Sequence, residues 1–171
     1  GQEAFAGKQL FVDYHQQELL VGNGSQPVLH LNGAPAFEWH FEQIGHVILV
    51  TVNIEGKNAW FILDTGSVNS LIDHIDAAAL NPTSATAERV LLESLDHKQN
   101  LAGRISPNNF SIQGKSIKNT SFLTTDMSND RNTLDFPVSG IIGNDLLSRY
   151  SIAIDYKEHK IKCWENTPAT R

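Results

Sequence analysis

Residues 60–67 carry the clearest signal in this chain: Trp-Phe-Ile-Leu-Asp-Thr-Gly-Ser. A short apolar run of this kind is typical of a strand buried on both faces. The run ends at Asp64, and an aspartate is rarely fully buried unless other groups compensate its charge. Gly66 lets the backbone turn tightly and bring N–H groups against the carboxylate, which favours the charged form. The same tripeptide also fits an ordinary Asx turn at a strand end, so both interpretations stay open.

Short strands joined by hairpin turns are expected on both sides of this stretch. Residues 46–54 and 59–63 flank one turn, and residues 90–95 and 101–105 flank another. Residues 73–80 predict a short helix with Asp73 as its N-cap. The other expected elements are strands at 110–112, from 117 onward, at 151–156 and at 160–164, with a polar loop at 126–135. This pattern predicts an all-β barrel or sandwich with one or two short helices.

Two turn signals, at residues 22–25 and 32–35, divide the chain. We expect an N-terminal arm of short strands at 1–36, a β domain at 37–165 and a tail at 166–171. The arm has three possible roles: pairing at a dimer interface, covering an exposed sheet edge, or acting as a regulatory or pro-segment. The sequence does not choose among them.

Composition excludes several classes of function. A formal net charge of −6 argues against nucleic-acid and anionic-membrane partners. No apolar run reaches the roughly 20 residues that span a bilayer, so membrane insertion is not expected. Cys163 is the single cysteine, and the histidines lack ligand spacing, so neither a metal nor another cofactor is expected. The chain starts at Gly1 rather than Met, which fits loss of a secretory signal and favours a periplasmic or secreted location.

Two segments together resemble a known family. Residues 61–67 resemble the active-site loop of aspartic peptidases, which reads apolar-apolar-Asp-Thr-Gly-Ser/Ala. Residues 140–147, Gly-Ile-Ile-Gly-Asn-Asp-Leu-Leu, resemble the segment that passes behind this loop, with Ile142 and Gly143 at its centre. Residues 148–156 resemble the closing strand of retropepsin-like bacterial aspartyl proteases. The resemblance covers roughly residues 38–164 and implies a single-lobe closed β-barrel.

The resemblance also implies a role for each residue of the loop. Asp64 would be the catalytic carboxylate. Thr65 would hydrogen-bond the opposing loop, and Gly66 would give its N–H to the carboxylate. Ser67 would hydrogen-bond the outer carboxylate oxygen and orient it. Gly143 would allow close packing behind the loop, and the two polar residues after it are interpreted as helix caps.

Hydrolysis of this type needs two aspartates that share one proton. The chain has one Asp-Thr-Gly and no duplicated half, so a homodimer would pair Asp64 with its own copy. The expected function is an aspartic endopeptidase acting on polypeptides. The hairpin near residues 93–103 is the candidate flap, with Asp96, His97 and Lys98 at its tip. This tip is polar and lacks a central glycine, so an ordinary solvated hairpin is the other interpretation. A non-catalytic peptide-binding or scaffolding domain is the alternative function.

Overall fold

The computed structural model describes residues 5, 7–23, 33–80, 86–93 and 99–166, and this part of the chain is mostly β. The strands are β1 (Lys8–Asp13), β2 (Glu18–Asn23), β3 (Phe37–Ile44), β4 (Val47–Ile54), β5 (Lys57–Leu63), β6 (Leu71–Asp73), β7 (Thr86–Glu93), β8 (Gln99–Ile105), β9 (Phe110–Ile112), β10 (Lys115–Ser116), β11 (Phe122–Thr125), β12 (Val138–Ile142), β13 (Tyr150–Asp155) and β14 (Lys160–Glu165). The helices are α1 (His74–Ala79), α2 (Ser128–Leu134) and α3 (Asn144–Leu147).

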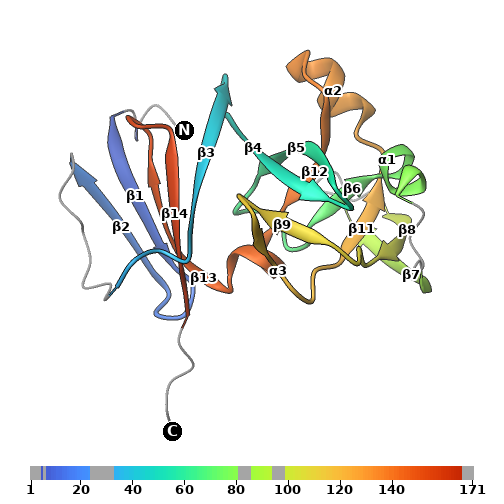
Figure 1. Cartoon of the computed structure of the whole chain (residues 1–171). Helices are drawn as coiled ribbons and strands as arrows, with labels where there is room; N and C mark the ends of the chain where they lie inside the picture. Colours follow the sequence, from blue (N-terminus) through green and yellow to red (C-terminus); the bar gives the residue numbers. More distant parts are fainter. Residues whose placement is uncertain (1–4, 6, 24–32, 81–85, 94–98, 167–171) are drawn as a thin grey trace, which may run out of the picture.

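The strands form an open sheet rather than the closed barrel that the resemblance implied. Their order is β2-β1-β13-β14-β3-β4-β5-β12-β6-β11-β8-β7, with β9 and β10 joined to β4 off this path. β3 explains why the sheet stays open, because residues 37–40 pair with β14 while residues 41–44 pair with β4. One long strand thus serves two groups of strands that lie on opposite sides of it, and the ends β2 and β7 do not pair with each other (Figure 1).

The N-terminal arm adds two strands to the β13 edge. β1 pairs with β13 in antiparallel register from Gln9 opposite Asp155 to Asp13 opposite Ser151, and β2 pairs with β1. The Gln9 amide donates to the Asp155 carboxylate at 2.7 Å, which fixes this register through side chains as well. β13 therefore lies between β1 and β14, the first and last strands of the described chain.

The predicted hairpin at residues 46–63 is confirmed. β4 and β5 pair in antiparallel register, and the turn between them places Glu55 and Gly56 at φ 48° and 82°. Two consecutive residues with positive φ are what a tight two-residue hairpin requires, and glycine is the residue that adopts this conformation most readily. The hairpin at 110–117 repeats the pattern, with Gln113 and Gly114 at φ 49° and 79°.

Two apolar clusters cover the two faces of the central strands. On β4, Val50 belongs to the large core and Leu49 to a small cluster with Met127 and Val138, and both are 0% exposed. On β5, Phe61 is fully buried in the large core, while its neighbours on the strand lie partly buried against the small cluster. The strand leading to Asp64 is thus buried more completely on one face than on the other.

The polar segment 126–135 forms α2 rather than the expected loop. Its sequence has no apolar periodicity, and none of its residues is buried, so the helix has no signature in the sequence. Arg131 supplies the physical reason, since its guanidinium donates to the buried carboxylate of Asp73 at 2.9 Å and to the Val138 carbonyl at 3.2 Å. With α2, the described part contains three short helices instead of one or two.

Candidate active site

Asp64 lies immediately beyond the end of β5, beside the end of β12. The two strands run parallel and pair as far as Leu63 opposite Ile142. The N–H of Asp64 then donates to the Ile142 carbonyl at 3.1 Å, so the backbone of the aspartate is fixed to β12. Its side chain is half-buried.

The carboxylate of Asp64 is held on one side. The N–H of Gly66 donates to Oδ1 at 2.8 Å, and a Cβ at Gly66 would lie 3.2 Å from the same oxygen. Among the described residues no donor reaches the other oxygen, Oδ2. Thr65 and Gly66 are exposed, so this part of the turn lies at the surface of the chain.

The hydroxyl of Ser67 does not orient the carboxylate as the resemblance implied. It donates to the Asn69 carbonyl at 2.8 Å. A hydroxyl has one proton to donate, so this bond within the loop leaves none for Asp64. The Ser67 N–H donates to the Asp64 carbonyl at 3.3 Å, which closes the turn through the backbone instead.

The segment around Gly143 packs directly behind this loop. A Cβ at Gly143 would lie 2.5 Å from the Asn69 carbonyl oxygen and 2.9 Å from that of Ser67. The N–H of Asn144 donates to the Ser67 carbonyl at 2.8 Å, and the N–H of Asp145 donates to the Val68 carbonyl at 3.1 Å. Only a residue without a side chain allows the two backbones to approach this closely.

Ser70 and Asp145 join the two segments through side chains, and the sequence analysis missed this connection. Ser70 is fully buried, and its hydroxyl and its N–H both donate to Asp145 Oδ1, at 2.6 and 2.9 Å. The Gly143 N–H donates in turn to the Ser70 hydroxyl at 3.0 Å. Asp145 is therefore no helix cap, since Gly143 occupies the N-cap position of α3. A serine three residues beyond the loop is too common a feature to signal this role.

Asn144 is likewise turned toward the loop rather than capping α3. Its Nδ2 donates to the Thr65 carbonyl at 2.9 Å. Its Oδ1 is buried and accepts no hydrogen bond within the described part of the chain. Buried polar atoms without a partner are rare in folded proteins, so this one calls for an explanation.

The candidate flap tip lies outside the described residues. β7 and β8 form the antiparallel hairpin expected around it, and β8 continues by pairing with β11. The three tip residues, Asp96, His97 and Lys98, fall in the gap between residues 93 and 99. The role of this hairpin stays a prediction.

One cluster of possible metal ligands occurs in the described residues: Asp73, His74 and Asp126, with ligand atoms within 4.8 Å of one another. Protein donors already occupy Asp73, whose carboxylate accepts two backbone N–H groups and the Arg131 guanidinium. Burial alone would raise the pKa of Asp73, but these hydrogen bonds and the arginine charge hold it below its usual value. The arrangement is that of a structural ion pair holding α2.

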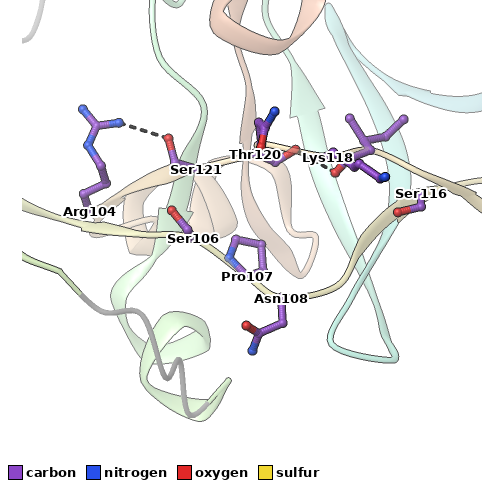
Figure 2. Close-up of a pocket in the computed structure, with 10 residues that line it drawn as sticks. Arg104, Ser106, Pro107, Asn108, Ser116, Lys118, Thr120 and Ser121 are labelled. Atoms are coloured by element: carbon purple, nitrogen blue, oxygen red, sulfur yellow. Dashed lines mark hydrogen bonds between the residues drawn. The ribbon is translucent and has the colours of Figure 1, made fainter.

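A polar pocket of about 550 Å³ opens elsewhere on the molecule, between the end of β8 and the segment that follows β10 (Figure 2). Arg104 donates to the Ser121 hydroxyl at 3.0 Å at its wall, and Lys118 lies on the other side. Residues 64–67 do not line it. It is therefore separate from the Asp64 site.

The comparisons with known proteins agree with this geometry. The sequence profile of a family described as "Aspartyl protease" matches residues 50–146, which is more than half of the chain. The matched range includes both the Asp64 loop and the Gly143 segment. The chain belongs to this aspartyl protease family. The comparison with curated proteins gives no significant match.

A solved structure shows the same fold. The crystal structure of a retropepsin-like aspartic protease from Rickettsia conorii matches with a TM-score of 0.53 at 22% sequence identity, covering 75% of this chain and 91% of that one. The fold is thus retropepsin-like, although the sheet here stays open. None of the helices in the described ranges is long and apolar enough to cross a membrane.

Proposed function

We propose that this chain is an aspartic endopeptidase whose active site forms when two copies bring their Asp64 carboxylates together. The observation that carries the proposal is the state of the Asp64 carboxylate. One oxygen is held by the Gly66 N–H at 2.8 Å, and the other has no donor among the described residues. Such a carboxylate is oriented on one side and open to a partner on the other.

The chemistry needs a second acid next to the first. Two carboxyl groups a few ångströms apart cannot both be ionised, so one stays protonated. The charged one takes a proton from a water molecule between them, and the protonated one polarises the scissile carbonyl. The chain contains a single Asp-Thr-Gly, so the second acid comes from another copy in a two-fold arrangement.

The surface around the loop supports this assembly. Val68 is 72% exposed, the most exposed of the large apolar side chains in the described residues, and it lies four residues after Asp64. Thr65 is exposed on the same loop and is free to hydrogen-bond a facing loop. A second copy that covers this surface would remove apolar area from water while it delivers the second carboxylate.

Cleavage of a mixed peptide library between about pH 4 and pH 7, a range typical of carboxylate pairs, tests the activity. We expect Asp64→Asn to abolish cleavage. Asp135→Asn is the matched control, because Asp135 is exposed at φ 49° and asparagine tolerates this conformation well. Equal cleavage by the wild type and Asp64→Asn would refute the proposal and favour the non-catalytic peptide-binding or scaffolding domain.

Subunit mixing tests the shared site separately. Titrating wild-type chain with an excess of Asp64→Asn should suppress cleavage, because mixed dimers hold one carboxylate where two are needed. The Asp135→Asn chain added in the same excess should not suppress it. Activity proportional to the wild-type chain alone, whatever the excess of Asp64→Asn, would show that each copy works by itself.

A further inference from the structure

The peptide group between Thr65 and Gly66 lies directly beside the Asp64 carboxylate. Its N–H end, on Gly66, donates to Asp64 Oδ1 at 2.8 Å. Its C=O end, on Thr65, accepts the side-chain amide of Asn144 at 2.9 Å. In a planar trans peptide group the N–H and the C=O point in opposite directions. The donor that reaches Asp64 and the carbonyl that Asn144 holds are therefore the two ends of one rigid unit.

The chain around this peptide group restricts its orientation only weakly. Gly66 has no side chain to limit rotation of the backbone, and both Thr65 and Gly66 are exposed. The hydrogen bond that closes the turn, from the Ser67 N–H to the Asp64 carbonyl, is long at 3.3 Å. Without Asn144, water would compete for the Thr65 carbonyl, and rotation of the peptide group would turn the Gly66 N–H away from the carboxylate.

The backbone of Asn144 is a firm anchor for its side chain. Its N–H donates to the Ser67 carbonyl at 2.8 Å, and the preceding Gly143 packs closely against the backbone of Ser67 and Asn69. The Leu147 N–H donates to the Gly143 carbonyl at 3.0 Å, which starts α3 at this point. The short amide side chain therefore reaches the Thr65 carbonyl from a fixed position, as a supporting residue of a functional site must.

The other atom of the Asn144 amide shows what this contact costs. Oδ1 is buried and has no hydrogen-bond partner within the described part of the chain. Exchanging the two ends of the amide would not help, because Oδ1 would then face the Thr65 carbonyl oxygen without a proton between them. A leucine of similar shape would avoid the unsatisfied acceptor altogether. A locally unfavourable group of this kind is expected at functional sites.

We propose that Asn144 is a positioning residue of the active site, whose amide holds the Thr65–Gly66 peptide group so that the Gly66 N–H stays on the Asp64 carboxylate. Hydrogen bonds in a chain polarise one another, so the bond from Asn144 also strengthens the bond that Gly66 donates. A donor to the carboxylate stabilises its charged form and fixes the direction of its oxygens. Only the consequence for catalysis rests on the proposed function.

Asn144→Leu removes the amide at nearly constant shape and adds no charge. We expect the ionisation midpoint of Asp64, followed through its ¹³C carboxyl signal, to rise by roughly half to one pH unit. Asp64→Asn assigns this signal, and all titrations use one chain concentration. The Gly66 amide proton reports on the donor itself, and its change in chemical shift on ionisation of Asp64 should become smaller. On the acidic limb of the pH profile, kcat/KM should fall roughly three- to tenfold, which is the same shift expressed as a rate.

Asn166→Leu is the matched control. The Nδ2 of Asn166 also donates to a backbone carbonyl, at 3.0 Å, but this carbonyl belongs to Ser148, outside the Asp64 loop. Its Oδ1 accepts the Ser151 hydroxyl at 2.8 Å. We expect Asn166→Leu to lower stability against urea and to leave the Asp64 midpoint in place. Asn144→Leu should change stability little, because the lost hydrogen bond is offset by removal of the unsatisfied Oδ1.

These measurements separate the two proposals. A raised midpoint in Asn144→Leu, together with no peptide cleavage by the wild type, refutes the endopeptidase and supports the role of Asn144 in holding the loop. An unchanged midpoint with an unchanged Gly66 amide response overturns this role, even if the wild type cleaves peptides, and so does an equal rise in Asn166→Leu. If Asn144→Leu fails to fold, Asn144→Ala, which adds no bulk, gives the answer by the same measurements.

Discussion

Gly143→Ala tests how the Asp64 loop is held. The added methyl group would lie 2.5 Å from the Asn69 carbonyl oxygen and 2.6 Å from its carbon, and both atoms belong to the backbone. A carbon and an oxygen need about 3.3 Å even in their closest favourable contacts. The two segments must therefore separate by roughly 0.8 Å, because neither atom can rotate away as a side chain would.

That separation acts on two backbone hydrogen bonds between the segments. Asn144 to Ser67 measures 2.8 Å and Asp145 to Val68 measures 3.1 Å, so a displacement of this size takes both beyond bonding distance. Two lost bonds cost about 2 kcal/mol in total, and overpacking adds about 1–3 kcal/mol. We expect the free energy of unfolding to fall by about 3–5 kcal/mol, a large part of the stability of a domain.

Urea unfolding measures this loss, and peptide cleavage measures its effect on catalysis. A displacement near 1 Å at reacting groups lowers rates by about a hundredfold. Gly103→Ala is the control for stability, because its methyl group would lie 3.4 Å from the Thr124 hydroxyl at an ordinary φ. It should cost less than about 1 kcal/mol. If Gly143→Ala unfolded within 1 kcal/mol of the wild type and cleaved normally, close backbone packing would not be what holds the loop.

Two further changes test the connections around the site. Ser70→Ala leaves the Gly143 N–H buried without an acceptor, so we expect the free energy of unfolding to fall by about 2–4 kcal/mol; a urea midpoint equal to that of the wild type would contradict the role of Ser70. The pKa of Asp73 is lowered in the folded chain. Its ionised carboxylate therefore adds to the free energy of unfolding at neutral pH, and this stabilisation is lost as the pH falls through the lowered pKa. Asp73→Asn should therefore cost about 2 kcal/mol at pH 7, and the difference from wild type should narrow below about pH 4; a constant difference in urea unfolding across this range would contradict the ion pair.

Local chemistry made part of this structure predictable. The tight hairpins at Glu55-Gly56 and Gln113-Gly114 are recognisable from the glycine in each turn, which adopts positive φ readily, and the structure has both. The Asp64 loop and the Gly143 segment are recognisable because each is continuous in sequence. The family match covers both of them.

The remaining features depend on residues far apart in the chain. Ser70 and Asp145 are 75 positions apart in the sequence, and Arg131 and Asp73 are 58 apart. No local sequence pattern predicts either of these side-chain hydrogen bonds. The prediction of a closed barrel was wrong. The alternation of apolar and polar residues along a strand predicts which of its faces is buried, but not which strands it pairs with. β3 pairs with β14 along its first half and with β4 along its second half.

The contacts around Asp64 are built almost entirely within one chain, and this bears on how a two-copy site would assemble. The loop is fixed by backbone bonds to Ile142, Asn144 and Asp145, with the buried Ser70 behind it. None of these bonds needs a second chain, so each copy would present its half of the site already shaped. Association would then add a carboxylate to an oriented partner without first refolding a loop. In such a scheme the concentration of the chain controls activity through dimerisation alone, and the open oxygen of Asp64 and the exposed Val68 are the features that a second copy must cover.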